Sequence, residues 1–407
     1  MPHFDIEPIV YVPENPSYPL LDLDLVKEVS PFVKVIKKPI IEPYAWASFF
    51  SKKAKKISSG IIPKAKKQSF ITKCLLWVRG NIFIPDARVL WVKPSVKHLE
   101  KIIKEEQIDT VVTSGPPHSM HLIGLGLKNK FGNALHWFAD FRDPWTTIGY
   151  HKELKLSNWA AKKHKTLEQK VLQTANHIIV TSLTTKKEFS VITNKPISVL
   201  TNGFDINDFS HKKAELATNF TFAHIGSLLS ERNPKVLWEV LNELVTENEA
   251  FKQHFKLELT GAISEEVIAS IKDFGLSSYL KLNNYVSHGK ALELQKQAQV
   301  LLLIEIDSEE TKCILPGKLF EYMLAARPIL ALGPKNADIE NIILETESGS
   351  YFTYNDKEAL KNQILTYFTA FQNQALYLPA DRSISHYSRK SITEELAILL
   401  KKKHPIK

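Results

Sequence analysis

The chain has 407 residues, a length that exceeds one ordinary hydrophobic core and favours two or three domains. Hydrophobic residues make up 44% of it and charged residues 24%, which is globular composition and excludes a disordered chain. No run of about 18 apolar residues predicts a membrane span, residues 1–12 lack the pattern of a signal peptide, and two cysteines exclude a disulfide framework. No Cys/His cluster has zinc spacing. We therefore expect a cytoplasmic protein without a metal site.

The formal net charge of +9 favours anionic partners, which include nucleotide phosphates, nucleic acids and acidic membrane surfaces. Between Ser51 and Gln68 stand seven lysines: Lys52, Lys53, Lys55, Lys56, Lys64, Lys66 and Lys67. On an anionic leaflet each contributes about 1 kcal/mol of attraction, so this run predicts a peripheral position at the inner face of the cell membrane. A solvated loop accounts for the run equally well. Because no aromatic residues interleave with the lysines, we expect no nucleic-acid partner.

Strand-like and helix-like patterns alternate along the chain, which is typical of parallel α/β domains. The first series of predicted strands is Glu7–Val12, Val33–Pro39, Thr110–Ser114, Leu135–Asp140, His177–Thr181 and Ser198–Thr201. The second series is Thr221–Ile225, Lys256–Thr260, Lys281–Val286, Val300–Ile306, Pro328–Leu332 and Ser350–Tyr354. Helical periodicity predicts helices at Ser95–Glu106, Ser157–Thr174, Pro234–Val245, Ala291–Gln297, Lys318–Ala325, Lys357–Phe371 and Arg389–Lys403.

The two series meet where periodicity lapses, from Asn202-Gly203-Phe204-Asp205 through the polar stretch up to Asn219. We therefore expect a first domain over residues 1–205, a linker over 206–219 and a second domain over 220–385. A C-terminal helix and tail over 386–407 follow. In parallel sheets, ligands bind beyond the carboxyl ends of the strands, so the residues that follow each strand are the candidates for chemistry.

The first candidate is Thr113-Ser114-Gly115-Pro116-Pro117-His118-Ser119. A glycine turns the chain after a strand, and prolines stand where a helix begins, a position that proline tolerates. The N–H groups of such a helix suit an anion or sugar hydroxyls, with His118 and His121 near the opening. The same prolines also fit a turn that has only a structural role.

The second candidate is the strand exit Ala139-Asp140-Phe141-Arg142-Asp143-Pro144-Trp145. Two acids that flank an arginine after a buried strand are costly unless they are paired or used. An ion pair of Arg142 with Asp140 or Asp143 is the structural alternative. A functional role is favoured over the ion pair, because these residues lie at the carboxyl end of a strand, where parallel sheets bind ligands.

The third candidate is Ile225-Gly226-Ser227 with Arg232 just before the next helix, since a guanidinium there binds phosphate bidentately. Alone, this signal is weak. The fourth is Pro316-Gly317-Lys318-Leu319-Phe320-Glu321-Tyr322, in which a Pro-Gly turn opens a helix with Lys318 in its first turn. Helix dipole, free N–H groups and an ammonium together suit a diphosphate, and Glu321 suits a ribose diol. A plain amphipathic helix with a surface Lys318–Glu321 pair is the alternative.

The order of these motifs resembles bacterial glycosyltransferases of family 4. The resemblance rests on GPPHS, ADFRDPW, TNGFD, the Gly-Ser loop with its arginine, and PGKLFEY followed by RPILALGP. It extends over nearly the whole chain, and the combination is more specific than any single motif. The resemblance implies the GT-B fold, an α/β fold of two facing Rossmann-like domains in which we expect the C-terminal helix to cross back to the first domain.

The resemblance also implies a retaining transfer of sugar from a nucleotide-diphosphate sugar to a glycan or lipid-linked acceptor in cell-surface polysaccharide synthesis, without a cofactor or an essential metal. By this analogy, Arg232 and Lys318 hold the diphosphate and stabilise the leaving group. The first domain presents the acceptor, with His118, Arg142 and Asp143 facing the transferred sugar. The donor is bound by residues of the second domain: Gly226, Ser227, Arg232, Tyr285, Val286, Gly317, Lys318, Leu319 and Glu321.

The sequence departs from the family pattern in three places. Cys313 stands where many members have an acidic residue, for which Glu309 or Glu310 would substitute, and Arg142 stands near the position of a common histidine. Family members usually have a first strand, glycine-rich loop and helix, about 30 residues, ahead of the segment that Glu7–Glu14 resembles, and by that comparison we expect this unit to be missing. From that loss we expect reduced stability and weak activity. A non-catalytic GT-B subunit and a nucleotide-sugar 2-epimerase are the alternative functions.

Overall fold

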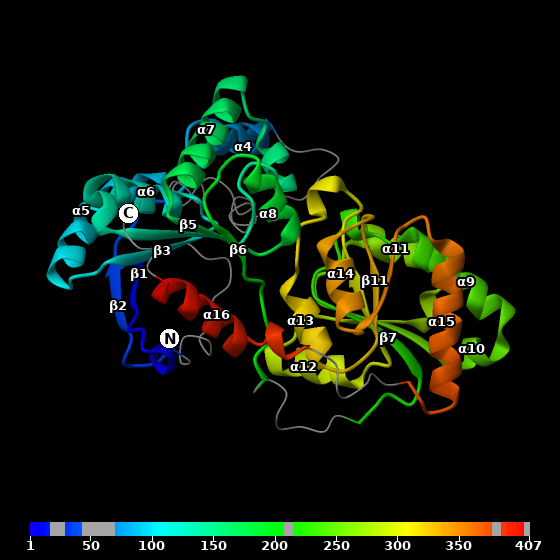
Figure 1. Ribbon diagram of the computed structural model, residues 1–407. Coiled ribbons are helices and arrows are strands. Elements are labelled where there is room, and N and C mark those ends of the chain that lie inside the picture. The colour runs from blue at the N-terminus through cyan, green and yellow to red at the C-terminus, as the bar shows by residue number, and fades with distance from the viewer. Residues whose placement is uncertain (17–28, 43–69, 207–214, 377–383, 403–407) are drawn as a thin grey trace. The chain divides into compact units, whose positions relative to one another are not determined.

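The computed structural model describes residues 1–16, 29–42, 70–206, 215–376 and 384–402 (Figure 1). The chain forms two compact units. Unit 1 comprises Met1–Leu200 with Thr393–Lys407, and unit 2 comprises Thr201–Ile392. The lysine run from Lys52 to Lys67 lies outside the described residues, as do residues 207–214 of the predicted linker.

Unit 1 contains two parallel sheets in its described part. Strands β1 (Ile9–Pro13) and β2 (Lys34–Lys38) pair with each other. The second sheet has the order β3 (Thr110–Gly115), β4 (His136–Phe141), β5 (His177–Val180) and β6 (Ile197–Val199). The helices among the described residues of this unit are α4 (Phe70–Asn81), α5 (Val89–Glu105), α6 (Ser119–Phe131), α7 (Asn158–Thr174) and α8 (Leu183–Ser190). Single 3₁₀ turns lie at Pro2–Phe4, Gly132–Ala134 and Gly149–Leu154.

The core of unit 1 follows from amphipathic patterns. Helix α5 buries Trp91, Val96 and Ile103 against Ile123 and Leu127 of α6. This is the apolar stripe that a helix of 3.6-residue period presents on one side. On the same face of the sheet, Trp137 and Phe141 of β4 lie in a second cluster of buried side chains, which includes Leu125 of α6. Helices therefore cover one face of this sheet, whereas Val112 and Ser114 of β3 are exposed on the opposite face.

Unit 2 is built on a six-stranded parallel sheet. Its order is β12 (Gly349–Phe352), β11 (Ile329–Leu332), β10 (Val300–Ile304), β7 (Phe220–Ile225), β8 (Phe255–Thr260) and β9 (Leu280–Asn283). Its helices are α9 (Lys235–Glu247), α10 (Glu249–His254), α11 (Glu265–Asp273), α12 (His288–Gln297), α13 (Gly317–Leu324), α14 (Asp338–Glu345) and α15 (Lys357–Gln372). Helix α16 (Arg389–Lys401) begins in unit 2, and its residues from Thr393 onward belong to unit 1.

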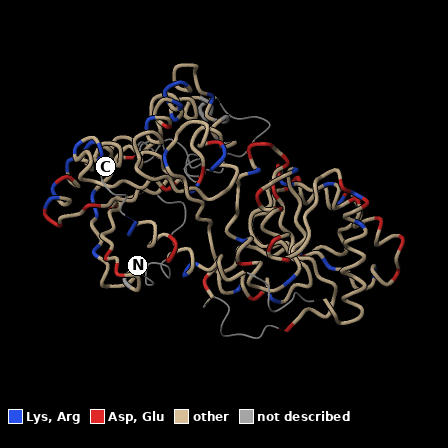
Figure 2. The backbone as a smooth tube through the Cα atoms, viewed as in Figure 1, with Lys and Arg blue, Asp and Glu red and all other residues tan. Residues whose placement is uncertain are grey.

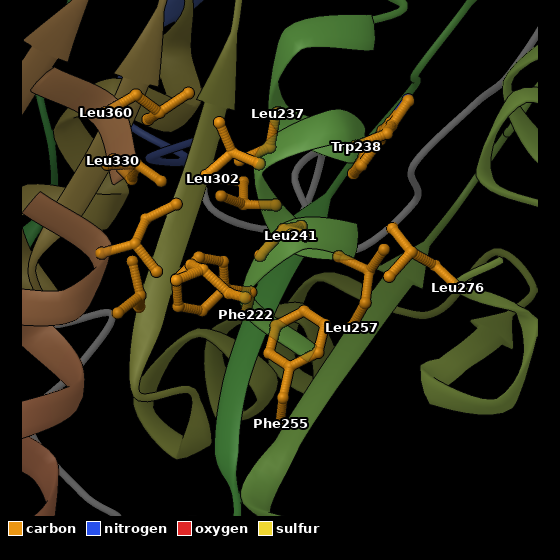
Figure 3. Packing of buried hydrophobic residues seen from close by; sticks show 14 of the residues in the cluster. Phe222, Leu237, Trp238, Leu241, Phe255, Leu257, Leu276, Leu302, Leu330 and Leu360 are labelled. Carbon is orange, nitrogen blue, oxygen red and sulfur yellow. The ribbon is translucent and has the colours of Figure 1, made fainter. Parts of the chain in front are cut away.

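Successive side chains in the strands of unit 2 point to opposite faces of the sheet, and both faces are buried. In β10, Leu302 and Ile304 join the cluster formed with α9 and α15, whereas Leu301 and Leu303 join the cluster formed with α13 and α14. Figure 3 shows the first cluster, in which Phe222 and Leu302 lie beside Leu237 and Leu241 of α9, and Leu330 lies near Leu360 of α15. This period of two is intrinsic to an extended chain. It places residue 305, the next in register, on the α13 side.

The order of strands in unit 2 reverses between β7 and β10, because β8 and β9 lie on one side of β7 and β10 to β12 on the other. Such a reversal is the point at which open parallel sheets bind ligands, beyond the carboxyl ends of the strands. The candidate site is therefore expected at the ends of β7 and β10.

The predicted α/β class with two Rossmann-like units is confirmed, and each predicted strand matches an observed one within a few residues. The larger differences are at β9, which ends at Asn283 rather than Val286, and at β10, which ends at Ile304 rather than Ile306. In the described part of the chain, no helix is both long and apolar enough to span a bilayer. Figure 2 shows acidic and basic residues interspersed along both units.

Candidate functional site

The loop after β7 is held in one conformation by its backbone. Gly226 has φ +124°, a region that side chains disfavour, and its N–H donates to the Thr260 carbonyl at 2.8 Å. A Cβ on Gly261 would lie 2.7 Å from the Gly226 oxygen, so the two segments can approach this closely only because residue 261 is a glycine. Leu228 N–H donates to the Ala262 carbonyl at 2.9 Å. The loop is thus fixed against the turn that follows β8.

Arg232 lies in a short 3₁₀ turn after this loop, directly ahead of α9. Its Nη2 donates to Oε2 of Glu305 at 3.1 Å, and the Glu305 side chain is 2% exposed. Burial raises the pKa of Glu305, although Arg232 and Lys318 oppose that effect. Glu305 follows β10, so this ion pair joins the ends of the two strands at which the strand order reverses.

Lys318 occupies the first turn of α13, and its Nζ lies 3.4 Å from Nε2 of His224. His224 donates from Nδ1 to the Leu302 carbonyl at 3.0 Å, and burial lowers its pKa well below the usual value. The imidazole is therefore neutral, with its Nε2 lone pair toward the ammonium. Burial lowers the pKa of Lys318 to about 8, and the nearby Glu305 carboxylate opposes the fall.

Glu321 lies one helical turn beyond Lys318 and accepts a hydrogen bond from Nε2 of Gln295 at 2.9 Å. Gln295 is buried, and its Oε1 has no partner among the described residues. The next residue, Tyr322, accepts from the Ile225 N–H at 2.9 Å. That contact fixes α13 against the end of β7 and so holds Lys318 beside the loop of Gly226. A Cβ built on Gly226 would lie 3.5 Å from the Lys318 Nζ.

The remaining predicted donor-binding residues differ in exposure. Gly317 is exposed and Ser227 is partly exposed, whereas Tyr285 is 81% exposed in the loop after β9, next to the partly exposed Val286. Leu319 is a fully buried core residue, and its N–H donates to the Pro316 carbonyl at 3.0 Å. Its side chain therefore packs α13 onto the sheet and does not face the site.

The arrangement suits an anion. Arg232, Lys318 and the N-terminal end of α13 present positive charge at one edge of unit 2, and the first N–H groups of a helix have no partner within it. Phosphates bind helix N-termini for this reason. Among the described residues, no group of three or more His, Cys, Asp and Glu side chains has the geometry of a metal site.

In unit 1, the acid–arginine–acid segment follows β4. Arg142 Nη1 lies 3.5 Å from Oδ1 of Asp140 and donates to the Leu200 carbonyl at 3.2 Å. Ser114 Oγ donates to the other Asp140 oxygen at 2.7 Å. Burial raises the pKa of Asp140 and of Asp143, while Arg142 opposes both shifts. The ion pair of Arg142 with Asp140, one of the two structural alternatives, is thus present.

His118 lies at the start of α6 and is 5% exposed. Its ring stacks on Trp145 with centroids 5.0 Å apart, and neither ring nitrogen has a partner among the described residues. Burial lowers the pKa of His118 well below its ordinary value, so the ring is neutral. His121 is also buried and donates to or accepts from Thr113 Oγ1 at 3.0 Å. His118 therefore lies among aromatic rings beneath the surface of unit 1.

Sequence reasoning missed His224, Gln295 and Glu305. Glu305 carried a usable signal, because an acid directly after five apolar strand residues is costly unless it is paired or used. Taking the strand to Ile306 hid that signal. His224 and Gln295 had none, since each lies inside an otherwise regular strand or helix.

No family model matches this chain, and no curated protein matches it in sequence. Solved structures do match. HepE from Anabaena, in complex with UDP-glucose, is similar over 75% of this chain and 81% of its own, with a TM-score of 0.55 and 16% identity. The lipopolysaccharide outer core galactosyltransferase WaaB is similar over 76% of this chain and 80% of its own, with a TM-score of 0.53 and 15% identity. WaaG, a glycosyltransferase involved in lipopolysaccharide biosynthesis, is similar over 92% of this chain and 88% of its own, with a TM-score of 0.51 and 12% identity.

A sucrose-phosphate synthase from Thermosynechococcus elongatus is similar at a TM-score of 0.54, with 12% identity over 76% of this chain and 77% of its own. These neighbours are two-domain glycosyltransferases, and the chain shares their fold. The protein therefore has the GT-B glycosyltransferase fold that the motifs predict.

Proposed function

We propose that this protein is a retaining hexosyltransferase that moves a sugar from a nucleotide-diphosphate sugar to a glycan or lipid-linked acceptor in cell-surface polysaccharide synthesis. The observation that carries the proposal is the pair of cations, Arg232 and Lys318, beside the start of α13 where the strand order of unit 2 reverses. That is the position at which parallel sheets of this order bind nucleotides.

The chemistry of the neighbours supports a nucleotide-sugar donor. The HepE structure contains UDP-glucose, and a structure of TarM with a TM-score of 0.50 contains UDP. WaaB is described as a galactosyltransferase of the lipopolysaccharide outer core. These ligands and acceptors belong to those proteins, and we extend them to this chain as part of the proposal.

In the proposed reaction, Lys318 and Arg232 bind the diphosphate and stabilise the negative charge that develops as the sugar leaves. Gly226 and Ser227 allow the backbone to approach the phosphates, and the exposed N-terminal end of α13 at Gly317 adds its dipole. Glu321, oriented by Gln295, accepts hydrogen bonds from the ribose hydroxyls. Tyr285 and Val286 contact the base. No protein nucleophile, metal or cofactor is assigned a role.

Unit 1 is proposed to present the acceptor. Arg142 and Asp143 contact the transferred sugar, and the ion pair with Asp140 holds Arg142 in place. For His118 to contact the sugar, its stacked ring must leave the side of Trp145. The lysines from Lys52 to Lys67 are proposed to meet the anionic inner leaflet at which a lipid-linked acceptor resides, which makes the protein cytoplasmic and peripheral to the membrane.

Calorimetry with nucleoside diphosphates tests the proposal. UDP, GDP, ADP and dTDP are titrated into the wild type and into Lys318→Ala, with Lys235→Ala, which removes an exposed lysine from the start of α9, as the matched control. We expect one nucleotide to bind the wild type and the control, and to bind Lys318→Ala at least tenfold more weakly. If no nucleotide binds the folded wild type, the glycosyltransferase proposal is wrong for this chain.

A further inference from the structure

Glu305 is a buried acid at the place where the proposed function requires positive charge. It is 2% exposed, and its Oε1 has no partner among the described residues. A buried carboxylate is costly, and an apolar side chain at this strand end would avoid that cost. A carboxylate next to a diphosphate also repels it. Its position therefore needs a reason other than packing.

The backbone of Glu305 is held on both sides. Its N–H donates to the Leu332 carbonyl at 2.8 Å, and its own carbonyl accepts from the Tyr354 hydroxyl at 2.7 Å. The neighbouring Gly333 leaves room for the Tyr351 hydroxyl, since a Cβ there would lie 2.5 Å from that oxygen. The carboxylate is thus presented from a rigid strand end toward α13.

From this position, the carboxylate acts on both cations of the site. Oε2 accepts from Nη2 of Arg232 at 3.1 Å, which fixes a side chain that comes from a short loop turn and is 25% exposed. Arginine loses rotamer freedom when it is fixed, so an arginine already held in place loses less on binding a nucleotide.

The second cation is Lys318. The charged and titratable groups that face it are His224, Arg232, Glu305 and Glu321. His224 is neutral and Arg232 disfavours a second positive charge, so the two carboxylates keep the ammonium protonated. Of these two, Glu305 has the larger effect on the Lys318 pKa.

We infer that Glu305 is a positioning residue for the nucleotide: its carboxylate fixes the Arg232 guanidinium and keeps the Lys318 ammonium charged, so that two cations stand ready for the diphosphate before it arrives. This inference rests on the proposed function and adds a role for a residue that would not itself touch the donor. It explains why a buried acid stands in an anion site.

The test is the pH dependence of nucleotide binding by Glu305→Gln, which keeps the shape of the side chain and removes its charge. The probe is the nucleoside diphosphate that binds the wild type. It is titrated between pH 7 and 9.5, where at least about nine-tenths of its terminal phosphate, with a second pKa of about 6, is fully ionised. Glu258→Gln is the matched control, because Glu258 on β8 pairs with Lys281 at 3.1 Å and is not part of the site.

In the wild type and in the control, we expect affinity to fall as the pH rises through about 8, since free Lys318 then loses its proton. In Glu305→Gln, the fall should begin at a pH lower by about half a unit or more, and affinity at pH 7 should drop by roughly tenfold. Loss of packing alone would weaken binding equally at every pH.

Two outcomes separate this inference from the proposed function. If the wild type binds no nucleoside diphosphate, the proposed function itself is wrong. If the wild type binds one and Glu305→Gln binds it with the same affinity and the same pH midpoint, the role of Glu305 is wrong and the donor site stands. Should Glu305→Gln not fold, Glu305→Asp replaces it: the charge is kept and moved away from Arg232, so weaker binding is expected, and unchanged affinity would overturn the inference.

Discussion

Lys318→Met should weaken nucleotide binding and stabilise the protein at the same time. The substitution exchanges the ammonium in the first turn of α13 for an uncharged side chain of similar length. The charged form of Lys318 destabilises the folded protein, because burial lowers the pKa of Lys318 from its ordinary value to about 8. A protein gains stability when such a charge is removed, and it loses whatever function the charge performs.

The magnitude follows from the pKa. A fall from 10.5 to about 8 corresponds to about 3 kcal/mol in favour of the neutral form. Because the side chain is partly exposed and offsets the charge of Glu305, we expect about half of this as a gain in unfolding free energy at pH 7. For a domain of this size, that is a rise in Tm of about 3–6 °C. Loss of a charge-assisted contact of about 1.5–3 kcal/mol weakens nucleotide binding roughly 10- to 100-fold.

Thermal unfolding at pH 7 to 10.5 and calorimetric titration measure the two effects, with Lys235→Met as the control for an exposed lysine at a helix start. The folded pKa of Lys318 is depressed, so the penalty is fully present below pH 8 and disappears as the pH rises toward 10.5. The difference in Tm should therefore shrink over that window. A Lys318→Met variant that is less stable than the wild type at pH 7, or whose difference in Tm does not change with pH, would show that the buried ammonium carries no such penalty.

Three further variants test a buried hydrogen bond, a close backbone contact and a buried histidine in the two units. Tyr322→Phe leaves the buried Ile225 N–H without its acceptor, so denaturant unfolding should show a loss of about 1–3 kcal/mol, and a loss below 0.5 kcal/mol would contradict the contact. Gly261→Ala places a Cβ 2.7 Å from the Gly226 oxygen and should weaken nucleotide binding at least several-fold in the same titration; unchanged affinity would show that the loop adapts. His118 has a depressed pKa, so it contributes a loss of stability as the pH falls below 6.5, where the unfolded chain takes up a proton first. In His118→Phe, Tm should depend less on pH between 6.5 and 5 than in the wild type, and an equal dependence would assign it to other groups.

The periodic parts of the fold could be predicted because their causes are local. Short, mostly apolar runs at 300–304 and 220–225 are enough to predict buried strands, since the central strands of a parallel sheet are covered on both faces. The Pro-Gly turn before Lys318 predicts the start of α13 for the same kind of reason: proline suits the beginning of a helix. Lys318 and Arg232 could be chosen as candidates because each follows a strand and its loop.

The partners of these residues could not be predicted, because they come from distant parts of the chain. Glu305 lies 73 residues from Arg232, and His224 lies 94 residues from Lys318. An acid that follows a strand can be solvated, contact a ligand or form an ion pair with a buried arginine. Which of these occurs depends on which strands are neighbours in the sheet. The burial of His118 and Leu319 depends on side chains that pack from other elements in the same way.

The class of the fold, the position of nearly every strand and the charged residues that follow the strands can thus be predicted from local sequence, since propensity, periodicity and turn chemistry act over a few residues. That β7 and β10 are neighbours, and that His224, Arg232, Glu305 and Lys318 therefore lie together, follows from the folded arrangement of distant segments. The physical reason is that strand order is set by the packing of whole helices onto both faces of the sheet. The charge state of each buried group follows from what that packing places around it.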